Sequence, residues 1–192
     1  MNFGISGRVV LFAAVFAYLC GCGPKPHFSQ DGTTYINRDF KCSLSLPGIK
    51  GWTYVYPDYT KDDRPDDIIF EAEHYGRLIN VFLTAQKINS GLEDFLILIK
   101  MSENLTESSS FREEETVRIN VNGVEGIRYI YSAQSEDPGG DGSRYIFINN
   151  LFKYREFNYN LIVATLYNEY GRKKELMDKI ADGFGVLRNT GE

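Results

Sequence analysis

The second half of the sequence alternates apolar and polar residues in long segments separated by short turns. Residues 117–121 alternate strictly and run directly into Asn122-Gly123, after which the alternation resumes over residues 124–134. Asn-Gly between two alternating segments is the strongest short signal for a β-hairpin. We therefore expect 117–121 and 124–134 to pair as antiparallel strands.

Two more strand-like segments follow this hairpin. They cover residues 143–154 and 157–166, and a turn near Arg155-Glu156 separates them. A loop at 135–142 leads into the first of the two, and its glycine-rich composition is typical of a loop tip. Because each connection is short, the four segments together predict an antiparallel meander.

Two helices are predicted. The first opens with Ser90 and Glu93, a spacing at which the serine can cap the third helical amide while the glutamate reaches back. The second covers about 168–182 and stops at Gly183. Their apolar stripes are Leu92, Phe95, Leu96 and Ile99 in the first helix, and Leu176, Met177 and Ile180 in the second.

The first half of the chain carries shorter strand signals bounded by turn residues. A Ser- and Glu-rich connector, 106–115, separates the first helix from the meander. Strands and helices in separate blocks predict an α+β fold, an antiparallel β-sheet flanked by helices. The strands expected in the first half are 33–37, 40–46, 52–56, 68–74 and 78–86.

The composition is that of one ordinary folded domain, which we place at residues 33–188, with a tail at 189–192. The chain has 192 residues, 13 Tyr and 13 Phe, enough large apolar side chains for a core without added staples. Its formal charge is -5 at pH 7. Because nucleic-acid binding depends on a basic surface, DNA and RNA are excluded as expected partners.

Residues 1–21 have the features of an export signal. Arg8 is followed by an apolar run from Val9 to Leu19, eleven residues long. A membrane-spanning helix needs about 20 apolar residues, so the run fits a cleaved signal peptide better than a permanent span.

The signal ends in Leu19-Cys20-Gly21-Cys22, which resembles the bacterial lipobox. The matching lipid acceptor is Cys22, because Tyr18 and Leu19 before Cys20 are too bulky for the signal peptidase. The alternative is that both cysteines are incidental thiols of an ordinary signal. The lipobox resemblance implies three acyl chains on Cys22, a palmitate-type membrane anchor, and a short tether at 22–32. Gly23 after the acceptor implies outer-membrane sorting, facing the periplasm, if the source is didermal.

The segment Phe40–Pro47 followed by Gly51-Trp52 resembles the opening strand and turn of PsbP-like proteins, a superfamily with bacterial DcrB-like members. The pattern 122–126, and then 145–166 before a terminal amphipathic helix, is similar to theirs as well. The resemblance covers nearly the whole mature domain. It implies an α/β/α sandwich that works as a binding or accessory scaffold without catalytic residues.

The sequence contains no strong catalytic or metal-binding motif, and we predict no cofactor, no metal and no catalytic residue. Neither H-E-x-x-H nor a phosphate-binding glycine loop occurs in it. A serine-type triad would have to use His74, which we place at a strand end. Glu113, Glu114 and Glu115 form a contiguous run that we interpret as a solvated connector.

Three other groups of residues allow a second interpretation. Asp62, Asp63, Asp66 and Asp67 could gather oxygens for calcium, but they lack the spacing of an EF-hand loop, so a solvated acidic loop is favoured. Cys42 is interpreted as a small buried apolar residue rather than a nucleophile. The tyrosines at 129, 131, 145, 154, 159 and 167 could bind sugars or proteins, yet packing on strands is favoured.

The sequence thus predicts a membrane-anchored bacterial lipoprotein that acts as a non-enzymatic binding or assembly module in the cell envelope. Its expected partners are the membrane, through the lipid on Cys22, and an envelope protein. Two alternatives remain open, an envelope hydrolase that uses carboxylates or His74, and a calcium-sensitive adaptor.

Overall fold

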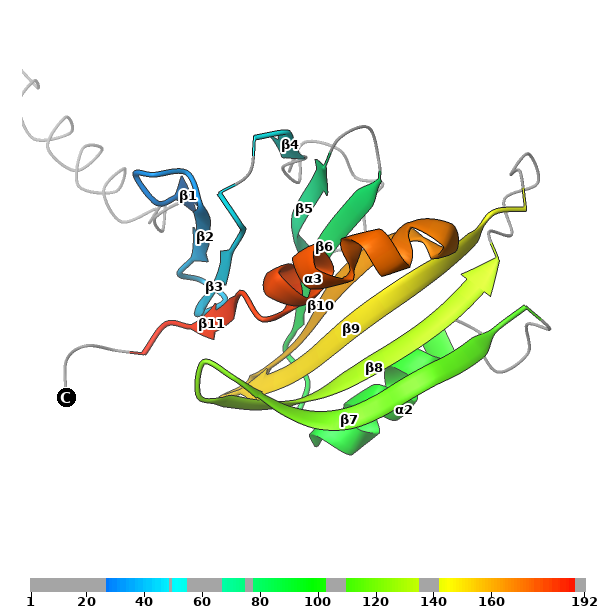
Figure 1. Ribbon diagram of the computed structural model, residues 1–192. Coiled ribbons are helices and arrows are strands. Elements are labelled where there is room, and N and C mark those ends of the chain that lie inside the picture. Colours follow the sequence, from blue (N-terminus) through cyan, green and yellow to red (C-terminus); the bar gives the residue numbers. More distant parts are fainter. Residues whose placement is uncertain are drawn as a thin grey trace, which may run out of the picture.

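The computed structural model describes residues 27–48, 50–54, 67–74, 78–102, 110–134 and 142–188. Most of these residues belong to two antiparallel β-sheets (Figure 1). The larger sheet has seven strands in the order β4-β5-β6-β10-β9-β8-β7, and the smaller sheet has four in the order β1-β2-β3-β11. The predicted α+β class with an antiparallel sheet is therefore confirmed, although strands far outweigh helices.

The predicted meander forms one side of the large sheet, with its four strands adjacent in chain order. Val121 pairs with Val124 across the first turn. Asn122 and Gly123 in that turn both have positive φ, 51° and 78°, as a tight two-residue hairpin turn requires. The strands are β7 (Arg112–Val121), β8 (Val124–Gln134), β9 (Arg144–Tyr154) and β10 (Phe157–Leu166).

The other side of the large sheet comes from the first half of the chain. It consists of β4 (Trp52–Tyr54), β5 (Ile68–His74) and β6 (Ile79–Gln86). The two halves join where β6 pairs with β10, with Leu83 opposite Leu161. This pairing joins strands from the two halves of the chain into one continuous sheet. Local sequence patterns predict the individual strands but not which strands pair with each other.

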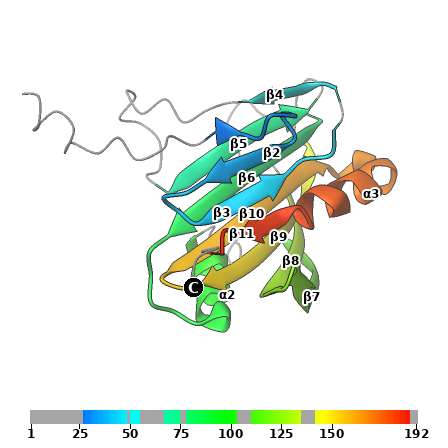
Figure 2. The ribbon, with the colours of Figure 1, turned by 90° about the vertical axis from the view of Figure 1, so that its left-hand side faces the viewer.

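The small sheet combines the two ends of the domain (Figure 2). It contains β1 (His27–Phe28), β2 (Thr34–Asn37), β3 (Cys42–Ser45) and β11 (Phe184–Val186). β1 pairs with β2, so the sheet begins at His27, inside the segment 22–32 that the sequence predicts to be a tether. β11 pairs with β3, so the C-terminal strand completes the small sheet.

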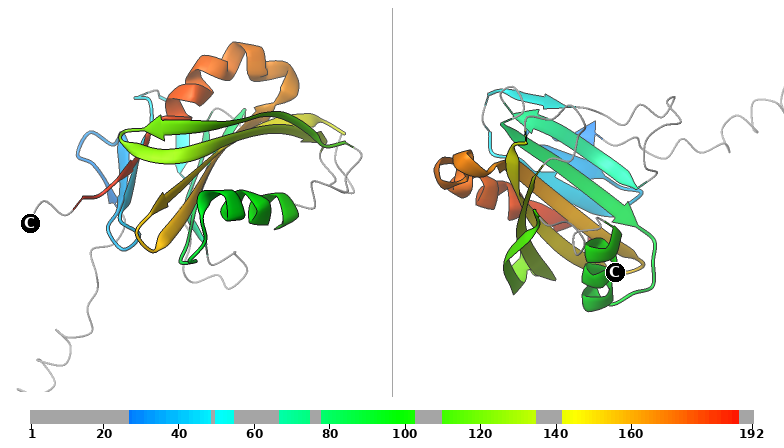
Figure 3. Two further views of the ribbon diagram at one scale, coloured as in Figure 1. Left: turned by 90° about the horizontal axis from the view of Figure 1, so that it is seen from below. Right: turned by 90° about the vertical axis from the view of Figure 1, so that its right-hand side faces the viewer.

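The two predicted helices are present and lie on opposite faces of the large sheet (Figure 3). They are α2 (Leu92–Ser102) and α3 (Tyr170–Ala181), and a 3-10 turn, η1 (Tyr167–Glu169), precedes α3. The capping-box residue Glu93 pairs with Arg118 on β7. The layers are thus α3 with the small sheet, then the large sheet, then α2.

The main core lies between the large sheet and the layer made by the small sheet and α3. Leu44, Leu83, Leu161, Met177 and Phe184 are fully buried there. The Tyr159 hydroxyl donates to the carbonyl of Phe40 at 2.6 Å, which ties the two sheets together. A smaller core under α2 contains Phe95, Ile127 and Leu151.

Candidate docking surface

Helix α2 carries large apolar side chains on its outer face. Ile97 is 55% exposed, Leu98 48% and Met101 65%, and Met101 lies beside both of the others because residues three and four positions apart in a helix are neighbours on its surface. A surface helix normally presents polar residues there. Contiguous exposed apolar side chains mark interaction surfaces, and we call these three residues the α2 patch.

The same helix buries a second apolar face against the sheet. Phe95 is buried on Ile127 and Leu151, and Leu92, Leu96 and Ile99 pack beside it. Sequence analysis identified this inner stripe but did not identify the α2 patch. The available signal was the unbroken apolar run from Phe95 to Ile99, which is longer than one helix face can bury.

Polar contacts fix α2 at both ends. Near its start, the carbonyl of Ser90 accepts a hydrogen bond from Lys153, and the Ser90 hydroxyl accepts one from Asn158 at 2.7 Å. Near its end, the Lys100 ammonium lies 2.8 Å from Glu113 and 4.5 Å from the centre of the Tyr129 ring. The α2 patch is therefore presented on a helix held in a fixed position.

Glu113, Glu114 and Glu115 are exposed, as predicted, but they lie in β7 rather than in a connector. A hydrogen bond from Lys100 lowers the pKa of the Glu113 carboxyl group. Glu114 accepts a hydrogen bond from the buried Ser132 hydroxyl at 3.1 Å. The run lies within β7 and ties this strand to α2 through Glu113 and to β8 through Glu114, because alternate side chains of a strand point to opposite faces.

A polar network joins the end of α3 to β8 on the opposite face of the large sheet. The Arg128 guanidinium lies 2.6 Å from Asp182 and 3.7 Å from Asp178, and it donates to the Asn150 side chain at 3.0 Å. Asn150 in turn donates to the Ala181 carbonyl at 2.8 Å. These acidic groups are paired in the folded chain, which suits a structural joint better than acid–base catalysis.

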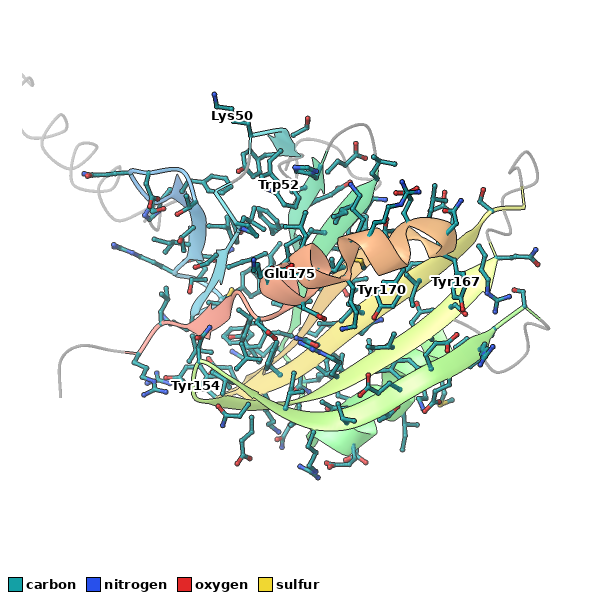
Figure 4. All side chains as sticks on the ribbon, viewed as in Figure 1. Lys50, Trp52, Tyr154, Tyr167, Tyr170 and Glu175 are labelled. Carbon is teal, nitrogen blue, oxygen red and sulfur yellow. The ribbon has the colours of Figure 1, made fainter. Side chains whose placement is uncertain are left out.

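Two cavities open along this flank of α3. One, of about 380 Å³, is lined by Ile119, Asn120, Val121, Asn122, Arg128 and Asp182. The other, of about 260 Å³, is lined by Ser143, Arg144, Leu166, Tyr167 and Asn168. Tyr167 and Tyr170 lie between the α3 layer and the sheet near the second cavity (Figure 4).

His74, the candidate catalytic base, is buried in β5. Its ring meets the Trp52 ring edge-on, 4.9 Å between centres, and Trp52 is labelled in Figure 4. Burial lowers the pKa of His74, and the positive charge of Lys173 lowers it further. Among the described residues, the charged group that shifts this pKa is the cation Lys173, and the burial of the ring favours a packing role.

Cys42 is fully buried in β3, as predicted, and burial raises the pKa of its thiol to about 12. Of the six tyrosines singled out, Tyr129, Tyr131 and Tyr159 are buried, which fits strand packing. Tyr167 is 43% exposed.

The predicted calcium ligands are only partly described. The Asp67 carboxylate accepts a hydrogen bond from Gln86 at 2.6 Å, whereas Asp62, Asp63 and Asp66 lie outside the described residues. Among the residues that the structure describes, no three His, Cys, Asp or Glu side chains are grouped to hold a metal ion. The calcium hypothesis therefore stays a prediction.

The lipid acceptor Cys22 and the signal 1–21 also lie outside the described residues, so membrane attachment stays a prediction. None of the helices in the described part of the chain combines the length and apolar character needed to cross a membrane.

Comparisons with known proteins show the fold. No family model and no curated protein matches the chain by sequence. The solution structure of cyanobacterial PsbP (CyanoP) from Synechocystis sp. PCC 6803 is similar, with a TM-score of 0.60, 15% identity, and coverage of 86% of this chain and 97% of that one.

Two further structures are similar. The Ran-binding protein Mog1p of Saccharomyces cerevisiae has a TM-score of 0.54 at 8% identity, with 82% of this chain and 96% of that chain covered. A Bacteroides thetaiotaomicron protein has a TM-score of 0.51 at 13% identity, with 85% of this chain and 51% of that chain covered. The chain therefore has a PsbP-like fold.

Proposed function

We propose that this chain is a lipid-anchored, non-enzymatic binding or accessory module of the bacterial cell envelope that holds a partner protein through the α2 patch. The observation that carries the proposal is the exposure of Ile97, Leu98 and Met101 on one face of a firmly anchored helix. Such a surface contributes to binding because an apolar partner removes it from water.

The chemistry of the described residues supports binding rather than catalysis. Cys42 and His74 are buried, and Asp178 and Asp182 are paired with Arg128. The PsbP-like fold is compatible with an accessory role, but fold alone does not assign one.

The anchor would place the domain close to a membrane. Four residues lie between Cys22 and His27 in β1, so the two are five residue steps apart, and a fully extended chain of five steps spans at most about 18 Å. An anchored domain can therefore contact only partners near the membrane surface. We propose a bacterial membrane, and the periplasmic face of the outer membrane if the source is didermal.

The test is cross-linking of intact bacterial cells that express the full-length chain with its native leader. Three variants are compared with the unmodified protein: Cys22→Ala, the triple change Ile97→Gln, Leu98→Gln and Met101→Gln, and a matched control on α3, Glu175→Gln with Lys179→Gln. The control changes an exposed ion pair on the opposite face of the sheet.

We expect a discrete set of cross-linked envelope proteins that the α3 control retains. Cys22→Ala should release the protein from the membrane fraction, and the triple variant should stay in that fraction but lose the partner set. The triple variant should also keep its melting temperature, because the altered side chains are exposed. Retention of the same partners by the triple variant would overturn docking through α2, and membrane retention of Cys22→Ala would overturn the lipid anchor.

A further inference from the structure

β7 is the long edge strand of this fold. In the described chain the other strands at sheet edges have only two or three residues, β1, β4 and β11, whereas β7 has ten. Figure 1 shows β7 along the outer side of the large sheet. The outward backbone groups of an edge strand form a template on which another extended chain can pair.

The two halves of β7 differ in how well they are protected against pairing with another strand. The first half contains three consecutive glutamates and a bulge between Glu113 and Glu115, both of which discourage edge pairing. The second half, from Thr116 to Val121, pairs with β8 in uninterrupted register. Six regular residues match the length of an ordinary strand, so this half can accept a partner.

The side chains of the second half that face α3 lie beside a cavity. Val117 pairs with Arg128 across the sheet and is 39% exposed, and Ile119 pairs with Gly126. Ile119 and Val121 also line the 380 Å³ cavity, together with Arg128 and Asp182. A strand added beside β7 would direct every second side chain to this face, next to the cavity.

The charged side chains of β7 indicate which charge the partner segment should carry. Glu113, Glu114 and Arg118 each have an ion-pair partner, in Lys100, Arg112 and Glu93 respectively. Glu115 has no ion pair among the described residues and faces the same side as Val117. A cation opposite Glu115 would therefore complete the edge, whereas the Thr116–Val121 edge of a second copy offers only Arg118, which already pairs with Glu93.

We propose that the Thr116–Val121 edge of β7 binds an extended segment of a partner protein as an added antiparallel strand. From the N-terminus of the bound segment onward, three of its side chains lie on the α3 side of the sheet. The first is apolar and lies opposite Ile119, the second is apolar and lies opposite Val117, and the third is basic and lies opposite Glu115. Backbone hydrogen bonds hold the segment, and its apolar side chain opposite Ile119 lies beside the cavity lined by Ile119, Arg128 and Asp182. This site is separate from the α2 patch and does not depend on it.

The probe is the peptide acetyl-Thr-Val-Thr-Val-Thr-Lys-Thr-amide, titrated into the full-length protein purified in detergent. Binding is measured by isothermal titration calorimetry, and amide hydrogen exchange reports which strand becomes protected. We expect saturable binding and added protection confined to residues 116–121. Absence of binding at millimolar peptide, or protection elsewhere, would overturn the proposal, as would a dimer whose β7 amides are already protected.

Two peptide controls identify strand pairing. N-methyl groups are placed on the odd-numbered peptide residues in one version and on the even-numbered residues in the other. Because the N–H groups of a strand point alternately to its two sides, one version should lose binding and the other should keep it. Equal binding by both versions would rule out an added strand.

A charge exchange tests the register. Changing the peptide lysine to glutamate should weaken binding about fivefold, the size expected when a surface ion pair becomes a repulsion. Glu115→Lys in the protein should restore binding of that glutamate peptide, and failure of this rescue would contradict the register. The triple variant of the α2 patch should bind the peptide with unchanged affinity. The peptide result therefore tests the β7 edge independently of docking through the α2 patch.

Discussion

The rings of Phe152 and Phe184 stack face to face, with 4.3 Å between their centres and 6° between their planes. Phe152 lies in β9 of the large sheet, and Phe184 opens β11 of the small sheet. Both side chains are fully buried. The C-terminal strand thus does more than complete the small sheet, because its first residue also packs that sheet against the large one.

Phe184→Ala is expected to lower the free energy of unfolding by about 3–5 kcal/mol, because it removes a buried ring and leaves a cavity between the sheets. Urea unfolding followed by circular dichroism measures the change. Phe184→Leu, which keeps most of the apolar volume, should cost less. A loss below about 1 kcal/mol for the alanine variant would show that the sheets do not depend on this contact.

Gly183 and Gly171 make a matched pair for alanine substitution. A Cβ at Gly183 would fall far inside van der Waals contact of the Ser45 carbonyl oxygen, whereas one at Gly171 meets nothing within 4 Å. Gly183→Ala should therefore destabilise by about 3 kcal/mol, since backbone must move. Gly171→Ala, inside α3, should stabilise by about 0.5–1 kcal/mol. Thermal unfolding of both variants checks the opposite signs.

His74 should make stability depend on pH in a defined window. Burial, and then Lys173, hold its pKa below 6.5 in the folded chain, so the unfolded chain binds the proton more readily. The free energy of unfolding should therefore fall as pH decreases from about 7 to about 5. His74→Phe should flatten this part of the profile, measured by thermal unfolding. An unchanged slope in the variant would assign the dependence to other groups.

Cys42 should be unreactive in the folded protein. Its thiol has a pKa of about 12 and is fully buried, so almost no thiolate is available at pH 8. In a variant with Cys20→Ser and Cys22→Ser, where Cys42 is the sole cysteine, a disulfide reagent such as DTNB should react only after denaturant is added. Rapid reaction of the native protein would contradict the buried position.

Asn149 offers a test of the buried polar groups near α2. It is fully buried in β9, and neither its amide nitrogen nor its oxygen has a hydrogen-bond partner among the residues that the structure describes. Asn149→Leu, of similar shape, should raise the free energy of unfolding by about 1 kcal/mol, because the unpaired amide is removed. A loss of stability would indicate that bound water or a ligand satisfies this amide in solution.

Local sequence patterns were sufficient for most elements. The meander around Asn122-Gly123 and both helices could be predicted because turn chemistry and side-chain periodicity act within a few residues. The burial of Cys42 could also be predicted, since Cys42 and Leu44 share the inward face of one strand. The PsbP-like fold could be recognised from the order of these elements.

The candidate surfaces could not be found in the same way. The α2 patch depends on which helix face the sheet covers, and the β7 edge depends on which strand has no neighbour. The sequence predicts that Glu113 belongs to a solvated run, and only the tertiary structure places Lys100 beside it. Membrane attachment through Cys22 remains a prediction from the sequence, and calcium binding at Asp62, Asp63, Asp66 and Asp67 remains an alternative to the predicted solvated loop.

The sequence by itself determined the strands, the helices and the hairpin turns, because these follow from interactions between near neighbours in the chain. Only the tertiary structure decided that β6 joins β10 and that β3 takes β11 as its partner. Segments so far apart pair only when the apolar area buried between them offsets the entropy of closing the intervening chain. That balance depends on the whole domain, so it cannot be predicted from a local sequence pattern.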